Sequence, residues 1–447
     1  MQRVLVAISL LLCLFPDGRA RGEPPAENSA EQTTLTLQEA LDIALAQHPT
    51  LRIGQAEVDA ARYRVRQEAT GYLPRGAYTY AYRREQRPLS SAVGGVQLDG
   101  TGQQQRRRTT AQIFHFNSTN FSISQLLFDF GQTLHAIRSA QASAEASRAD
   151  LEAVRQTVIF NTKQAYYTVL SAQRLRQVAE ETVQQNQKHL EEARARFEVG
   201  LAPRFDVTQA QVQVSNAELD AVTARNNVAL ARETLRTAMG ETGPFLYTLV
   251  DTLQRGTVTF DDEAIVSQAY ANRPEIRSLR LQQRAATERV TSLQRQYLPS
   301  ISATGQYNWT GREYPLQEGW IWGLTLTFPL FDSILTNAQV GEARADLRNV
   351  EAQGENLRQQ VVLEVRQSFL NLRQAEESIR VSEQALIQAQ ENLALAEGRY
   401  SAGVGNIIEV TDAQVSLTSA RANNIQALYT YKTAVAELEK AIGQRLE

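Results

Sequence analysis

The sequence predicts a mainly α-helical protein with a small membrane-type β part, built as a duplicated helix, β-hairpin, helix repeat. Three observations predict this fold class. Blocks of sequence recur at fixed offsets, long proline-free stretches carry an apolar seven-residue period, and short segments between them alternate apolar with polar residues. The 447-residue chain has a formal net charge of -3 and no apolar run of about 18 residues, which excludes a helical membrane bundle and argues against a nucleic-acid binder.

Residues 1–20 have the pattern of a secretory signal peptide, with a positive start, an apolar stretch and the small-x-small cleavage site Gly18-Arg19-Ala20. The one cysteine of the sequence, Cys13, lies inside this segment. The mature chain is therefore expected to have no disulfide, no thiol catalysis and no cysteine-ligated metal. Residues 21–34, rich in Pro, Glu, Ser and Thr, are predicted to be a disordered leader.

The recurring blocks define two copies of one unit. Pro49 recurs as Pro274 at an offset of 225 residues, whereas Gly240 recurs as Gly443 at an offset of 203. The difference of 22 residues is an insertion in the first copy, and the polar segment 89–110 is assigned to it as an exposed loop. The predicted organisation is a first repeat at 35–240, a linker at 241–260 and a second repeat at 261–443.

Coiled-coil helices are predicted where proline is absent. From Val361 to Tyr400, apolar or small residues recur in alternating steps of four and three, and the first copy repeats this stripe from Val158 to Phe197. A further stripe begins at Val207. A sustained seven-residue period predicts a left-handed supercoil.

The expected helix lengths differ by a factor of two. A helix at about 132–199 would be roughly 100 Å long, and helices near 36–72, 204–240 and 261–297 would reach about half that length. Two short helices stacked end to end would therefore match one long helix.

Alternating segments predict two β-hairpins, at about 75–126 and about 300–329. Each strand has about ten residues, which is the span of an outer-membrane barrel strand. All three tryptophans fall in the second hairpin, as expected of an aromatic girdle at a membrane interface. The alternative is a soluble sheet that packs on one face. The residues assigned to the girdle are Tyr307, Trp309, Trp320 and Trp322.

A lipid-facing sheet of four strands requires partner subunits. About eight strands are needed to close a barrel, and an open edge in lipid would leave backbone groups unpaired. The chain is therefore expected to oligomerise, with two copies supplying eight strands and three copies twelve.

In the order and duplication of its motifs, the chain resembles the TolC family of outer-membrane efflux proteins (outer membrane factors) over about residues 35–443. The resemblance is carried by the Leu-Pro pairs before each hairpin, by LLFDFG and FPLFDS after them, and by the helix turns ARFEVGLAPRFDVTQAQ and GRYSAGVGNIIEVTDAQ. It implies a homotrimer with a twelve-stranded β-barrel in the outer membrane, continuing as a twelve-helix α-barrel into the periplasm of a Gram-negative envelope.

The same resemblance implies a passive exit duct of a tripartite efflux pump or a type I secretion system. Its partners would be a periplasmic adaptor (membrane fusion protein), an inner-membrane transporter and outer-membrane lipid. Family members are not enzymes. The alternative function is a periplasmic or surface coiled-coil protein, structural or adhesive, without a pore.

The helix turns at 197–206 and 400–409 lie far from the hairpins, which places them at the periplasmic mouth. By resemblance, these tips would contact the adaptor through Arg196, Gly200, Arg399 and Gly403. Plain turn chemistry is the alternative for the glycines, because glycine often ends a helix.

The periplasmic gate is assigned by resemblance to Glu409 and Asp412, which share a helix face and would form a ring of six carboxylates in a trimer. A solvated acidic pair at a helix N-terminus is the alternative. Asp206 and Gln209 are their first-copy counterparts. Some family members have a latch arginine where this chain has Gly405, so closure here is expected to depend on Tyr400 and helix packing.

Enzymatic chemistry is not expected. His48, His115, His135 and His189 show no metal-ligand spacing and are interpreted as surface or packing residues. The sequence has no phosphate-binding glycine loop with lysine, no nucleophile elbow and no zinc signature, so neither cofactor nor metal is predicted.

Overall fold

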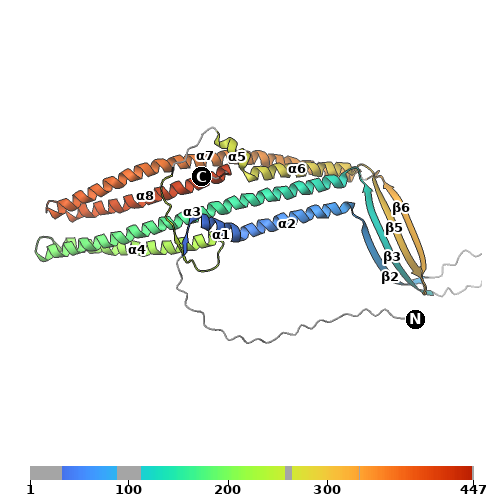
Figure 1. Ribbon diagram of the computed structural model, residues 1–447, viewed down its shortest axis with the longest axis horizontal. Coiled ribbons are helices and arrows are strands. Elements are labelled where there is room, and N and C mark those ends of the chain that lie inside the picture. The colour runs from blue at the N-terminus through green and yellow to red at the C-terminus, as the bar shows by residue number, and fades with distance from the viewer. Residues whose placement is uncertain (1–32, 88–111, 257–263, 332, 445–447) are drawn as a thin grey trace, which may run out of the picture.

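The computed structural model describes residues 33–87, 112–256, 264–331 and 333–444, in which two helical layers run along the long axis and a β-sheet lies at one end (Figure 1). The signal peptide and the insertion at 89–110 lie outside these residues. The first repeat comprises α1 (Leu37–Gln47), α2 (Pro49–Ala69), a 3-10 turn (Thr70–Tyr72), β2 (Arg75–Arg87), β3 (Gln112–Phe128), α3 (Gln132–Glu198) and α4 (Arg204–Met239). The second comprises α5 (Ile265–Asn272), α6 (Pro274–Arg295), β5 (Ser300–Gly311), β6 (Gln317–Thr327), α7 (Ser333–Ser401) and α8 (Ile407–Ile442). The duplicated helix, hairpin, helix order is confirmed.

Two long helices are each matched by a stack of shorter ones. Helices α3 and α7 have 67 and 69 residues, so each is roughly 100 Å long. Both α2 and α4 pack along α3, whereas α6 and α8 lie between α3 and α7 and contact both of them. Across the subunit, neighbouring helices therefore follow the order α2 or α4, then α3, then α6 or α8, then α7. This order leaves α7 and the α2–α4 stack at the two edges.

Two segments that were each predicted to form one continuous helix form two helices in the structure. The helix expected at 36–72 is broken at His48, and the one expected at 261–297 is broken at Arg273. Both residues precede a proline that begins the next helix, and proline excludes its predecessor from helical geometry. Accordingly, the ψ angles are 125° at His48 and 124° at Arg273.

Each break receives the C-terminus of another helix. Gly240 ends α4 and Gly443 ends α8, both with positive φ. A Cβ atom on Gly240 would lie 2.8 Å from the Cα of His48, and one on Gly443 would lie 3.0 Å from the backbone N of Arg273. The stacked helices therefore meet backbone to backbone at joints that exclude any side chain.

The leader prediction is wrong for Thr33 and Thr34. They belong to β1 (Thr33–Leu35), which pairs in parallel with β4 (Tyr247–Leu249) inside the predicted linker. The Tyr166 hydroxyl lies 3.0 Å from the Leu35 carbonyl oxygen and 2.8 Å from that of Val250, and its burial raises the pKa of this hydroxyl to about 12. Three-residue strands carry too little periodicity to be predicted from sequence.

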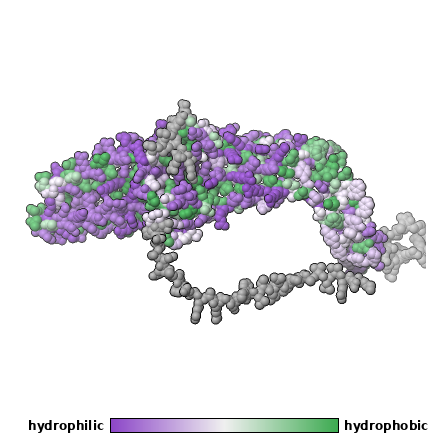
Figure 2. All heavy atoms as spheres, viewed as in Figure 1, coloured by the Kyte–Doolittle hydropathy of each residue, from purple (hydrophilic) through white to green (hydrophobic). Residues whose placement is uncertain are grey.

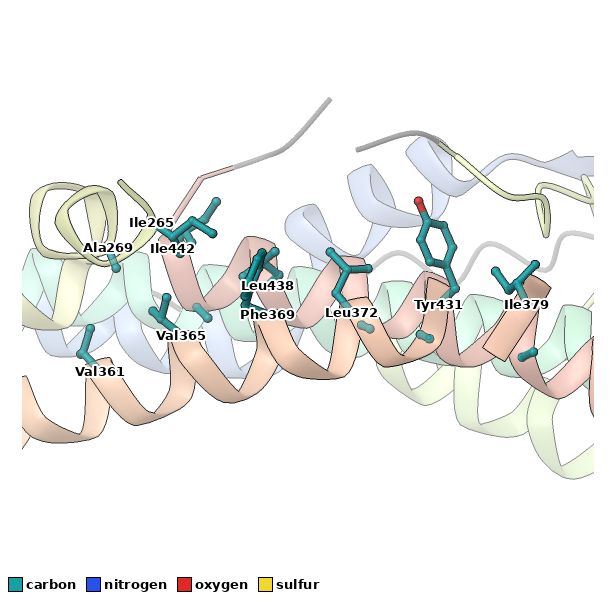
Figure 3. Packing of buried hydrophobic residues seen from close by; sticks show 14 of the residues in the cluster. Ile265, Ala269, Val361, Val365, Phe369, Leu372, Ile379, Tyr431, Leu438 and Ile442 are labelled. Carbon is teal, nitrogen blue, oxygen red and sulfur yellow. The ribbon is translucent and has the colours of Figure 1, made fainter. Parts of the chain in front are cut away.

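The predicted seams form the helical core. Figure 3 shows Phe369 of α7 beside Leu438 of α8, whereas Val361 of α7 lies toward Ala269 of α5. The stripe from Val361 to Ile379 is buried. The first-copy stripe fails at its end: Phe197 is 44% exposed, although its repeat counterpart Tyr400 is only 8% exposed. Helical periodicity places these two rings equivalently, but only Tyr400 packs in the core of its own hairpin, where the Arg196 guanidinium also covers its ring.

One face of the sheet carries most of its aromatic side chains. Its strands are antiparallel in the order β2-β3-β5-β6, and the register aligns Tyr78, Phe121, Tyr307 and Trp320 in one row. Trp320 and Trp322 are 68% and 73% exposed. Figure 2 shows hydrophobic residues gathered where the helices meet the sheet, whereas the sheet is mostly intermediate in hydropathy and the helical body is mostly hydrophilic. None of the helices in the described ranges is long and apolar enough to cross a membrane.

Candidate functional site at the helix tips

The predicted site residues gather at the end of the molecule opposite the sheet, where α3 turns into α4 and α7 turns into α8 (Figure 1). Gly200 and Gly403 stand at these turns with φ of 76° and 74°. This left-handed geometry reverses the chain directly after each long helix, and it favours glycine because other residues pay a steric penalty.

Arg196 joins the two tips. Its Nη1 donates a hydrogen bond to the Tyr400 carbonyl at 3.0 Å, and its guanidinium carbon lies 4.3 Å from the centroid of the Tyr400 ring. Arg196 belongs to α3 and Tyr400 to α7, so this side chain connects two elements that are about 200 residues apart in sequence.

Tyr400 is buried, and its hydroxyl has no hydrogen-bond partner in the described part of the chain. Burial is the main cause that raises the pKa of this hydroxyl; the Asp206 and Glu192 carboxylates raise it further, and Arg196 lowers it. Tyr400 therefore packs in the core of its own hairpin, between α7 and α8.

Asp206 is also buried, at 9% exposure, in the first turn of α4. Burial raises the pKa of its carboxyl, because a low-polarity surrounding disfavours the charged form. Gln209, one turn further along, is half-buried. The structure therefore brings Arg196, Tyr400 and Asp206 into one electrostatically connected group.

Glu409 and Asp412 are exposed in the first turns of α8. Arg399 Nε donates to the Glu409 carboxylate at 3.2 Å, and Arg399 Nη2 lies 3.4 Å from the Val404 carbonyl. The side chains of this ion pair are 58% and 47% exposed, so the pair contributes little stability. Glu409 is thus partly neutralised within its own hairpin, whereas Asp412 presents a carboxylate one turn further along α8.

Gly405 is tightly packed in the turn between α7 and α8. A Cβ atom there would lie 2.9 Å from both the backbone N of Tyr400 and the Cβ of Arg399. The close return of the chain after α7 therefore excludes a side chain at this position unless the turn itself changes.

Further polar contacts between the hairpins were missed by the sequence analysis. Gln185 Nε2 donates to Glu397 Oε1 at 3.3 Å, and His189 Nε2 lies 3.7 Å from the same atom. Arg421 Nη1 donates to Glu181 at 3.1 Å. Helical periodicity shows that these positions avoid the seam within a hairpin, but it carries no information about contacts with another hairpin.

The predicted girdle residues differ in exposure. Trp320 and Trp322 are open to the surroundings, whereas Tyr307 and Trp309 are half-buried, with ring centroids 4.5 Å apart. The Tyr307 hydroxyl donates to Glu318 at 2.8 Å. In the described residues, no group of three or more His, Cys, Asp or Glu side chains is placed to hold a metal ion.

This geometry defines a class of protein: an envelope channel subunit, with a lipid-type sheet at one end of long helices and a narrow pair of helix turns at the other. A match to a family model identifies the family. The model of the outer membrane efflux protein family matches residues 40–241 and 265–444. The chain is 26% identical over 418 residues to outer membrane protein TolC of Escherichia coli, covering 89% of this chain and 80% of that protein.

Two further matches are to a second relative and to a solved structure. Protein CyaE of Bordetella pertussis is 25% identical over 429 residues, with 94% of this chain and 86% of that protein covered. The Campylobacter jejuni CmeC outer membrane channel matches with a TM-score of 0.78 at 17% identity, covering 92% of this chain and 86% of that one.

The chain belongs to the outer membrane efflux protein family. This membership confirms the recognition from motifs, the fold class, the outer-membrane location and the channel function in efflux or secretion. Members of this family are channel proteins.

Proposed function

We propose that the chain acts as a homotrimer that forms the passive, non-enzymatic exit duct of a tripartite efflux pump or a type I secretion system. One observation carries this proposal: a four-stranded sheet with an exposed apolar face continues directly into helices of roughly 100 Å that end in paired turns. A sheet anchored in lipid would leave those turns deep in the periplasm, within reach of partners from the inner membrane.

The edges of the subunit support assembly by rotation about one axis. Strands β2 and β6 are the edge strands of the described sheet, so β6 of one copy can pair with β2 of the next. Three sheets would then supply twelve strands and leave no edge in lipid. This head-to-tail pairing closes into a ring when each copy is rotated by the same angle.

The helical edges carry matching apolar stripes. On α4, a stripe opposite its buried seam is exposed, and α7 has an equivalent stripe at the other edge of the subunit. Contact between them would bury both stripes and would give a closed wall of helices. The α4 stripe consists of Phe205, Val212, Leu219 and Leu230, and the α7 stripe consists of Leu363, Leu370, Val381 and Leu395.

The tips support the proposed docking on a periplasmic adaptor. Val199, Leu201 and Val404 are 68%, 79% and 69% exposed around Gly200 and Gly403, which is unusual for apolar residues without a partner. Arg399 is exposed beside them. Arg196 is less suited to this role, because Tyr400 occupies its guanidinium.

The proposed gate is the set of acidic and aromatic groups at the same end. In a trimer, Glu409 and Asp412 would repeat around the axis as a ring that attracts cations. Asp206, Gln209 and Tyr400 lie near the same turns, where movement of one hairpin against the other would alter the opening. These residues remain our assignment of the constriction.

Membrane extraction and conductance test the proposal together. The channel requires detergent for extraction and gives discrete single-channel currents in planar bilayers. A coiled-coil structural protein or adhesin would instead be released by salt or carbonate washes and would leave the bilayer silent. That pair of results would overturn the proposal.

A further inference from the structure

The two hairpins at the tips have separate hydrophobic cores. In the first, Leu190 and Ala193 of α3 pack with residues of α4. In the second, a cluster that includes Leu393, Tyr400 and Leu417 is made by α7 and α8. No hydrophobic cluster of the described residues joins the two hairpins at this end. Polar contacts are therefore the main side-chain links between the two hairpins.

The internal repeat shows that one of these contacts is special. An offset of 203 residues relates Arg196 to Arg399 and Asp206 to Glu409. In the second hairpin, Arg399 bonds to Glu409, and the pair stays within one hairpin. In the first, Asp206 has no ion pair among the residues that the structure describes, and the Arg196 guanidinium instead reaches Tyr400 of the other hairpin.

We propose that Arg196 is the positioning residue that holds the two tip hairpins together in the closed state. We call its contact with Tyr400 the clasp. The assignment rests on the proposed channel function, since it concerns how the periplasmic end closes. It replaces the adaptor contact that sequence resemblance gave to Arg196.

The geometry of the clasp combines two favourable interactions in one side chain. The Tyr400 carbonyl lies in the last turn of α7, where partial negative charge favours a cation. The planar guanidinium donates to that carbonyl at 3.0 Å while it covers the face of the same residue's ring at 4.3 Å. A flexible ammonium group cannot reproduce both contacts equally well.

The packing at Gly405 explains why the clasp comes from α3. A Cβ atom at 405 would meet the backbone N of Tyr400 at 2.9 Å, so position 405 has no room for a latch side chain in this turn. Arg196 approaches from the neighbouring hairpin, where its partner Tyr400 is already fixed in a hydrophobic core. The closed state thus depends on a side chain outside the α7–α8 hairpin.

Conductance of the purified full-length channel in planar bilayers tests the clasp. R196A is expected to raise the occupancy of the open state about tenfold, because it removes a hydrogen bond to a charged donor and a cation–π contact. R196K is expected to fall between R196A and the wild type. R194A is the matched control: it removes an exposed arginine two residues away on α3 and should leave the open-state occupancy unchanged.

Hydrogen exchange provides a readout that does not depend on conduction. R196A should accelerate exchange in α3 near 186–198 and in α7 near 393–401, whereas R194A should not. Y400L keeps an apolar side chain but removes the ring, so it should reproduce part of the faster exchange. In the R196A background the ring contact is already lost, so Y400L should cause no further acceleration through that contact.

These outcomes separate the clasp from the proposed function. A silent bilayer combined with faster exchange in R196A would overturn the channel proposal and leave the contact between hairpins standing. If the wild type and R196A conduct with the same open-state occupancy and exchange at the same rate at both tips, the clasp is refuted. The channel proposal would then still stand.

Discussion

Substitution of the joint glycine Gly240 by alanine tests how the short helices stack. Gly240 has φ of 78°, and a Cβ atom would lie 2.8 Å from the Cα of His48. Gly200 has nearly the same φ, 76°, but no atom lies within 4 Å of its Cβ position. Both substitutions carry the cost of left-handed backbone, and only G240A adds a collision with the start of α2.

The magnitudes follow from these two terms. Left-handed backbone costs a residue with a Cβ roughly 1–2 kcal/mol, so G200A is expected to lower the free energy of unfolding by that amount. Displacement of closely packed groups adds about 1–3 kcal/mol, which gives roughly 2–5 kcal/mol for G240A. Gly443 and Gly403 form an equivalent pair in the second repeat, with φ of 73° and 74°.

Thermal denaturation in detergent, followed by far-ultraviolet circular dichroism, measures the difference. The midpoint should fall more for G240A than for G200A, and more for G443A than for G403A. Equal shifts within each pair would refute the backbone-to-backbone joint and would mean that the stacked helices are held only by their side packing.

Three further predictions concern the tip and the sheet. E409A/D412A should weaken block by multivalent cations and change single-channel conductance; unchanged values would remove both residues from the gate. D206N should raise the thermal midpoint at neutral pH. Burial raises the folded-state pKa of Asp206, so the charged carboxylate lowers the stability of the folded state as pH rises through that pKa, and asparagine removes this charge. This advantage should shrink as pH falls toward the ordinary pKa of Asp, about 3.9, and a constant difference over that range would contradict the burial argument. Brominated phospholipids should quench the intrinsic tryptophan fluorescence, since all three tryptophans lie in β5 and β6; unquenched emission would show that the apolar face packs on protein.

Most of the helices and strands can be predicted from the sequence, because their residue periodicity is strong and recurs in both repeats. The stripe from Val361 to Ile379 is buried as expected, and the alternation around Trp320 and Trp322 places both rings on the apolar face. The breaks at His48 and Arg273 were missed, although proline at the next position is a local signal that steric rules can interpret.

The tip could be located from sequence, but its contacts could not. Turn glycines and helix ends place Arg196 and Arg399 at equivalent positions, and nothing in the local sequence distinguishes them. They differ because Arg196 faces Tyr400 across the hairpins, whereas Arg399 faces Glu409 within one. Phe197 and Tyr400 also hold equivalent positions, yet only Tyr400 belongs to the core of its hairpin, and its ring carries the Arg196 guanidinium.

The mass of the purified mature protein in detergent tests the central claim most directly. If each subunit supplies four strands of a shared barrel, light scattering corrected for bound detergent will give the mass of three chains. A single chain of mature mass that stays in solution after the detergent is removed would contradict the account.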